Sequence, residues 1–139
     1  MNFRLLLITG PAGVSKSTVA SEWASSREER CVHLSLDLFH HMVKTGFIDP
    51  KQGWSDEVQQ QLDTARANVV SVARRYLYTG YQVVVDDTLF SDWEAVGFGP
   101  WHRVMAQIEV DLVALMSDWE VALARVKAVL FTSRYLMGC

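Results

Sequence analysis

Residues 3–18 read FRLLLITGPAGVSKST, and this stretch decides the fold of the chain. Residues 3–9 are a short apolar run closed by Gly10 and Pro11, a pattern typical of a buried strand that enters a turn. A helix is expected from about Lys16, because apolar residues recur at helical spacing after it, namely Val19, Ala20, Trp23 and Ala24. The stretch therefore predicts a strand, a glycine-containing turn and a helix, in that order.

The turn in this stretch fits the phosphate-binding loop, or Walker A motif, GxxxxGK[ST]. Such a loop surrounds phosphates with successive backbone N–H groups, and the N-terminus of the following helix adds positive potential. Lys16 would reach the β- and γ-phosphates of ATP, and the hydroxyl of Ser17 would ligate Mg²⁺. The candidate cofactor-binding residues are Gly10, Pro11, Ala12, Gly13, Val14, Ser15, Lys16, Ser17 and Thr18.

One position departs from the motif, because Ser15 stands where the pattern has glycine. A Cβ at this position is expected to crowd the phosphates or to disfavour the local backbone conformation. The alternative interpretation is a turn that only caps the helix. The strand before the turn and the helix after it favour phosphate binding.

Further strands and helices alternate along the rest of the chain. Strands are expected over 31–36, 81–85 and 108–116, and helices over 37–45 and from Ser55 to near Gly80. In the long helix the apolar residues recur at helical spacing, and polar residues such as Arg66 fall elsewhere. Two copies of Ser-Asp-Trp-Glu, at 91–94 and 117–120, fit capping boxes and predict two more helix starts. This alternation predicts an α/β layered fold.

Composition limits the class of protein. The chain has 139 residues, half of them hydrophobic, and a net charge of −3, which indicates one globular domain over 1–139. The apolar run before Gly10 is shorter than an export signal, and no run approaches the ~18 residues of a membrane span. Cys31 and Cys139 have no metal-ligand spacing, which favours a reducing cytoplasm. The acidic balance argues against binding of duplex nucleic acid.

Carboxylates follow two of the expected strands. Asp37 follows the strand over 31–36, and Asp86 and Asp87 end the valine-rich strand, so all three should converge near the phosphates. One carboxylate beside a hydroxyl acceptor is chemically sufficient for phosphoryl transfer, although Asp37 could equally be a helix N-cap. Asp86 and Asp87 point to opposite faces of their strand, so one of them is expected to hold Mg²⁺, and the sequence leaves open which.

Three segments together resemble the small P-loop kinases, a group that includes chloramphenicol phosphotransferase-like, gluconate kinase-like and polynucleotide kinase-like proteins. These segments are residues 8–14, the Asp37 segment with His41-Met42-Val43, and Val85-Asp86-Asp87-Thr88. The likeness covers roughly residues 3–125. It implies a three-layer α/β/α P-loop fold whose parallel sheet has the strand order 2-3-1-4.

The resemblance also implies roles for two residues. Asp37 would accept the proton of the substrate hydroxyl or orient that group, and Arg125 would be a lid arginine on the transferring phosphate; a surface helix charge is the other interpretation of Arg125. Members of the group continue with a polar lid and a fifth strand. Here residues 128–131 are apolar, so the lid and the fifth strand are expected to be missing and the domain to be short at its C-terminal end.

These observations predict an ATP- and Mg²⁺-dependent phosphotransferase in the cytoplasm, acting on a small-molecule or nucleotide hydroxyl. The alternatives are a catalytically impaired nucleotide-binding or interaction module, which Ser15 favours, and a P-loop ATPase. The segment Val126–Met137 is expected to be an apolar helix that packs on a second copy of the chain or on another protein. His40, His41 and His102 are interpreted as surface or core residues rather than metal ligands, and Trp101 as a core or rim residue.

Overall fold

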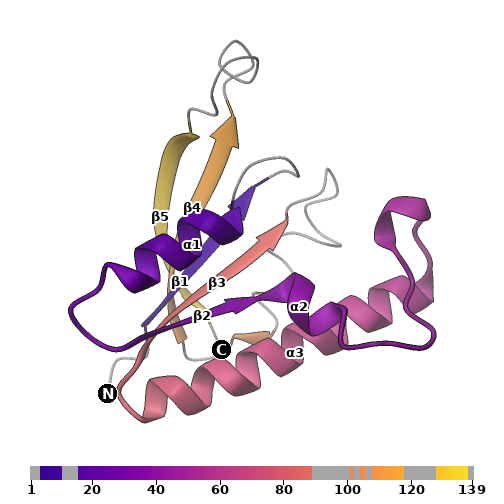
Figure 1. Ribbon diagram of the computed structural model, residues 1–139, viewed down its shortest axis with the longest axis horizontal. Coiled ribbons are helices and arrows are strands. Elements are labelled where there is room, and N and C mark those ends of the chain that lie inside the picture. The colour runs from indigo at the N-terminus through magenta and orange to yellow at the C-terminus, as the bar shows by residue number, and fades with distance from the viewer. Residues whose placement is uncertain are drawn as a thin grey trace.

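A computed structural model describes residues 4–10, 16–88, 101, 104, 105, 108–117 and 128–137. It contains a single sheet with helices packed against it (Figure 1). The strands are β1 (Arg4–Gly10), β2 (Cys31–Ser35), β3 (Gln82–Thr88), β4 (Ile108–Ser117) and β5 (Ala128–Met137). The helices are α1 (Lys16–Ser25), α2 (Leu36–His40) and α3 (Asp56–Tyr78), with a short 3₁₀ helix η1 (Pro50–Gln52).

The order of strands across the sheet is β2-β3-β1-β4-β5. The first four strands pair in parallel, with β1 between β3 and β4, which confirms the predicted order 2-3-1-4. Parallel strands need long crossover connections; α1 lies in the connection from β1 to β2, and α3 lies in the connection from β2 to its neighbour β3. The carboxyl ends of β1, β2 and β3 therefore meet at one edge of the sheet.

The prediction for the C-terminal segment is wrong. Residues 128–137 form the strand β5, which pairs antiparallel with β4 from Ile108↔Met137 to Ser117↔Ala128. A fifth strand is thus present, and no apolar helix occupies 128–137. A short apolar run fits a buried strand and a buried helix equally well, and pairing with the open edge of β4 decides in favour of the strand. Ser117 ends β4 in the structure, and the helix expected to begin at residue 91 lies outside the described residues.

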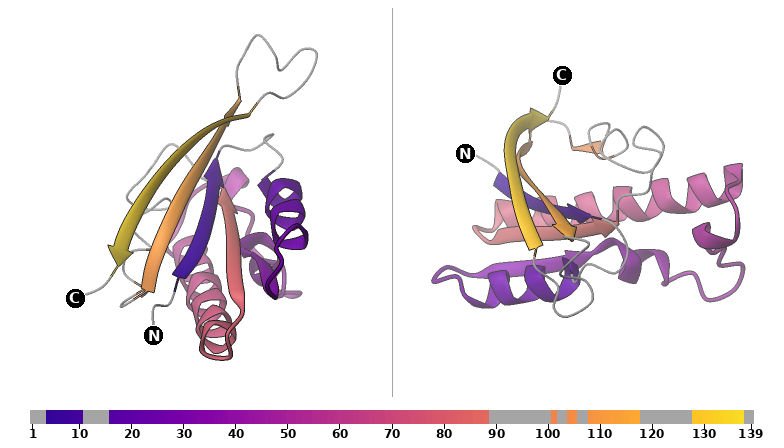
Figure 2. Two further views of the ribbon diagram at one scale, coloured as in Figure 1. Left: turned by 90° about the vertical axis from the view of Figure 1, so that its left-hand side faces the viewer. Right: turned by 90° about the horizontal axis from the view of Figure 1, so that it is seen from above.

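The two faces of the sheet are covered by different helices, as the views in Figure 2 show. The larger core cluster lies between the sheet and α3 and includes Leu5, Leu7, Val83 and Val85 from the central strands. The smaller cluster lies between the sheet and α1 and includes Ile8, Ala20 and Val84. Since side chains alternate along a strand, neighbouring residues of β1 and β3 serve opposite faces. The predicted three-layer α/β/α arrangement is therefore confirmed.

The helix predicted from Ser55 to near Gly80 is also confirmed. The Ser55 side chain accepts a hydrogen bond from the Val58 N–H at 3.2 Å, which caps the N-terminus of α3. At the other end Gly80 has φ +91°, a left-handed conformation that favours glycine after a helix. The helix expected over 37–45 is shorter in the structure and ends at His40. Among the helices that the structure describes, none is long and apolar enough to cross a membrane.

Candidate functional site

Lys16 is the first residue of α1, directly after the candidate phosphate-binding loop, and its side chain is buried. Burial lowers the pKa of the Lys16 ammonium below its ordinary value of 10.5, and the carboxylates of Asp86, Asp37 and Asp87 oppose that shift. The structure therefore brings three acids from the ends of β2 and β3 into electrostatic reach of one lysine. Because the acids outnumber the ammonium, this cluster has the charge to hold a divalent cation beside a phosphate.

The other loop residues are placed only in part. Gly10 ends β1 and is buried, whereas Ser17 and Thr18 lie exposed on the first turn of α1. Residues 11–15, including Ser15, lie outside the described part of the chain, as does Arg125. A hydroxyl on the first turn of the helix is accessible to a ligand at the loop.

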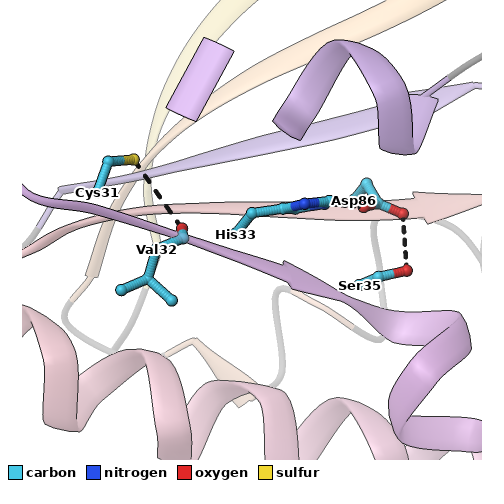
Figure 3. A network of polar contacts seen from close by, with 5 residues as sticks. All are labelled: Cys31, Val32, His33, Ser35 and Asp86. Atoms are coloured by element: carbon cyan, nitrogen blue, oxygen red, sulfur yellow. Dashed lines mark hydrogen bonds and ion pairs between the residues drawn. The ribbon is translucent and has the colours of Figure 1, made fainter. Parts of the chain in front are cut away.

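The Asp86 carboxylate lies on the face of the sheet that α1 covers. Side chains of β2 contact both of its oxygens: His33 Nε2 contacts Oδ2, and the Ser35 hydroxyl donates a hydrogen bond to Oδ1 at 3.1 Å (Figure 3). Asp86 is 6% exposed and is the carboxylate with the largest effect on the pKa of Lys16. It is thus buried, oriented and directed at the phosphate-loop side of the sheet.

The Asp87 carboxylate lies on the opposite face, toward α3. The indole Nε1 of Trp101 donates a hydrogen bond to Asp87 Oδ2 at 2.6 Å, and the Arg66 guanidinium lies 3.8 Å from the same oxygen. Arg66 and Trp101 are each 1% exposed. The negative charge of Asp87 is therefore balanced by the buried Arg66 guanidinium, and the buried Trp101 indole donates to it. Neither residue belongs to the phosphate-binding loop.

Asp37 lies in the first turn of α2, and its side chain is exposed. The structure makes Ser35 the N-cap residue of α2, and no side chain caps that helix. The interpretation of Asp37 as an N-cap is therefore wrong. What remains is an accessible carboxylate at the carboxyl edge of the sheet, close enough to raise the pKa of Lys16.

Four residues that contact Asp86 or Asp87 are not predicted by the sequence to do so: His33, Ser35, Arg66 and Trp101. His33 and Ser35 belong to an expected strand with no signal for a polar partner, and the helical pattern predicts Arg66 on the polar face of the long helix. Arg66 is four residues from both Leu62 and Val70, which are buried, so helical spacing does place it on the buried stripe. Trp101 is a core residue, as interpreted, but its donor to Asp87 has no signal in the sequence.

Within the residues described, no three or more His, Cys, Asp or Glu side chains cluster as metal ligands. His40 is buried against Gln61 and His41 is exposed beside Phe47, which agrees with their interpretation as core and surface residues; His102 lies outside the described residues. A Mg²⁺ ion needs few protein ligands, since it usually keeps several waters and contacts one or two carboxylates plus phosphate. Ser17 and Asp86 fit that requirement.

A glycine-containing loop between a central parallel strand and a helix with a buried lysine, flanked by acids at the strand ends, defines a P-loop nucleotide-binding fold. The model of the AAA domain family matches residues 5–129. The chain belongs to this P-loop kinase-like family.

A solved structure agrees on the fold. A chain in the structure of a Pnkp1/Rnl/Hen1 complex superimposes with a TM-score of 0.55 and 16% identity, over 81% of this chain and 35% of that chain. The present chain thus spans about a third of the length of that relative. A KaiC-like protein, PH0186 from Pyrococcus horikoshii OT3, matches with a TM-score of 0.44 and 14% identity, over 96% of this chain and 78% of that chain. A comparison with curated protein sequences finds no significant match.

Proposed function

We propose that this protein transfers the γ-phosphoryl group of ATP to a hydroxyl of a small molecule or a nucleotide. The observation that carries the proposal is the buried Lys16 at the start of α1, with Asp37 and Asp86 acting on its charge from the ends of β2 and β3. Membership of a P-loop kinase-like family supports nucleotide binding, and the accessible Asp37 supports a hydroxyl acceptor. A cytoplasmic location, where ATP is abundant, is part of the same proposal.

Lys16 is assigned to the phosphates. Its ammonium is already desolvated in the folded protein, so its interaction with an anion is stronger than that of an exposed lysine. Together with the loop that follows Gly10, it would hold the β- and γ-phosphates and stabilise the charge that spreads over the transferring group.

Ser17 and Asp86 are assigned to Mg²⁺, Ser17 through its hydroxyl and Asp86 through its carboxylate or a water molecule. The bound ion would neutralise charge on the phosphate oxygens. Asp86 is preferred over Asp87 because Asp86 lies on the α1 face, whereas Arg66 and Trp101 engage Asp87 on the α3 face.

Asp37 is assigned to the acceptor. Its carboxylate would take the proton from the acceptor hydroxyl as that oxygen bonds to the γ-phosphorus and the bond to the ADP oxygen breaks. Arg125 keeps the role that the resemblance gives it, a cation on the transferring phosphate. We include polynucleotide 5′-hydroxyls among the candidate acceptors, because the group that the sequence resembles includes polynucleotide kinase-like proteins.

The experiment is transfer of labelled γ-phosphate from Mg-ATP to a panel of hydroxyl acceptors. The panel should contain a 5′-hydroxyl oligonucleotide, a sugar acid and an aromatic alcohol. We expect a labelled product with one acceptor class and none with Lys16→Met. Mg-ATP binding together with release of free phosphate only would identify an ATPase and overturn the proposal.

A further inference from the structure

Asp86 is held by two side chains of the neighbouring strand β2. His33 Nε2 contacts one carboxylate oxygen, and Ser35 Oγ donates to the other at 3.1 Å (Figure 3). The Asp86 side chain is 8% exposed and that of His33 is 20% exposed. Two separate groups therefore fix one buried carboxylate.

The strand register explains how β2 reaches Asp86. Ser35 is paired with Asp86 across the parallel β2–β3 ladder, and His33 is paired with Val84. Residues two apart on a strand point to the same face, so His33 and Ser35 both face α1, as Asp86 does. The His33 imidazole is long enough to reach past its own pairing partner Val84 to Asp86, the next residue of β3 on that face.

Contacts to both oxygens restrict a torsion that is otherwise soft. Rotation of a carboxylate about its last bond has broad energy wells, so an aspartate without partners samples many orientations. A carboxylate offers about four acceptor positions in all, and β2 uses one on each oxygen. The remaining positions are not used by β2, and the Lys16 ammonium acts electrostatically on the same carboxylate.

We infer that His33 and Ser35 are positioning residues that hold the Asp86 carboxylate in the orientation required for a divalent cation bound with ATP. The inference rests on the proposed function only in placing the Mg-nucleotide at Lys16. Neither residue touches the nucleotide in this scheme, because each acts through Asp86. Groups that orient a metal-binding carboxylate typically change metal affinity or activity by 10–100-fold when they are removed.

The experiment measures Mg²⁺ dependence of ATP binding, by thermal shift, at fixed ATP with Mg²⁺ titrated from an EDTA baseline. His33→Phe keeps a ring but removes both nitrogens, and Ser35→Ala removes one oxygen atom. We expect each variant to need about 10-fold more Mg²⁺ for half of the ATP-dependent shift, with the shift in EDTA unchanged. Ser35→Ala alters so little volume that it remains readable if phenylalanine is not accommodated at residue 33.

Conservative variants separate positioning from general support of the fold. His33→Gln keeps a side-chain N–H donor and Ser35→Thr keeps the hydroxyl, so both should restore most of the Mg²⁺ affinity. Trp101→Phe is the matched control, since it removes a buried donor from the neighbouring Asp87 and should leave the Mg²⁺ midpoint unchanged.

Three results would overturn the inference: equal Mg²⁺ midpoints for wild type and His33→Phe, conservative variants no better than the disruptive ones, or no Mg²⁺-dependent shift in wild type. The proposed function fails by a different result. A wild type with Mg²⁺-dependent ATP binding, sensitive to His33→Phe but without phosphate transfer to any acceptor, would refute the kinase and support the positioning role.

Discussion

Trp101 donates a hydrogen bond from its indole nitrogen to Asp87 Oδ2 at 2.6 Å, and both side chains are buried. The contact fixes the segment at Trp101 to the carboxyl end of β3 on the face that α3 covers. The preceding residue, Asp86, has its partners on the other face of the sheet. Adjacent acids at the end of one strand thus have different chemical surroundings.

Trp101→Phe should lower the free energy of unfolding by about 1–3 kcal/mol, because it removes the indole donor from a buried carboxylate oxygen. The measurement is the urea midpoint of unfolding. Trp54→Phe is the control, since Trp54 is 47% exposed and its replacement should change stability by less than about 0.5 kcal/mol. Indistinguishable midpoints for Trp101→Phe and wild type would contradict the role given to this hydrogen bond.

Arg66→Met should destabilise the protein by about 3–5 kcal/mol, because the buried Asp87 carboxylate would lose the buried guanidinium that lies 3.8 Å from it. Adding Asp87→Asn to Arg66→Met should recover part of that loss, and the double-mutant cycle measures the coupling. Arg75→Met on the exposed side of the same helix is the control. Strictly additive effects of Arg66→Met and Asp87→Asn would show that the two side chains do not interact.

Lys16→Met should stabilise the nucleotide-free protein at neutral pH. Burial lowers the pKa of Lys16, so between that lowered value and 10.5 the unfolded chain binds more protons than the folded protein. The destabilisation of the folded protein by the buried Lys16 charge is therefore complete below this pH window. It decreases as the pH rises toward 10.5. Unfolding curves at several pH values should show the variant's advantage shrinking over the same window.

The same Lys16→Met variant should lose stabilisation by Mg-ATP, whereas wild type gains about 2.7 kcal/mol at 100 times the dissociation constant. Lys44→Met, at an exposed position, controls for removal of a positive charge. An equal thermal shift with ATP in wild type and Lys16→Met would refute the phosphate site.

Asp37→Asn should abolish most transfer to the acceptor while ATP binding and stability stay near those of wild type. The amide keeps the size of the side chain but cannot take a proton, and general-base catalysis typically contributes 10²–10⁴-fold. Asp56→Asn is a matched control, because Asp56 is an exposed acid in the first turn of α3 as Asp37 is in α2. Unchanged turnover in Asp37→Asn would remove the base from the mechanism.

Ser15→Gly tests whether the departure from the loop pattern impairs nucleotide binding. If the serine Cβ crowds the phosphates, its removal should tighten Mg-ATP binding, and relief of about 1.4 kcal/mol corresponds to tenfold in affinity. Calorimetric titration of both proteins measures the effect. If the protein is adapted to Ser15, its affinity for Mg-ATP changes little; if the serine impairs the loop, the affinity increases. Absence of Mg-ATP binding in both proteins would exclude the kinase and the nucleotide-binding module together.

The central fold could be predicted because its signals are local. The apolar run before Gly10, the lysine after the loop and the long helix closed at Gly80 each specify one element, and the resemblance then supplies the strand order. The segment 128–137 could not be predicted in the same way, since pairing with β4 decides its structure and the sequence of the segment alone does not.

For the site, the sequence pattern predicts which acidic residues lie at the strand ends, but it does not predict which side chains contact them. Asp86 and Asp87 stood as equivalent candidates until the contacts of His33, Ser35, Arg66 and Trp101 distinguished them. Those partners come from β2, from α3 and from Trp101, which is in a helical conformation. Only the tertiary arrangement brings them together.

The three consecutive valines of β3 have a consequence for folding fidelity. Val83, Val84 and Val85 are equally apolar on both faces, so a slip of β3 by one residue would exchange the faces of the strand at little hydrophobic cost. The same slip would move Asp86 to the α3 face and Asp87 to the α1 face. Asp86 would then lose its contacts with His33 and Ser35, and Asp87 its contacts with Arg66 and Trp101. The acids and their partners therefore select the correct alignment of the central strand, and replacing both acids by leucine should yield a sheet with mixed registers.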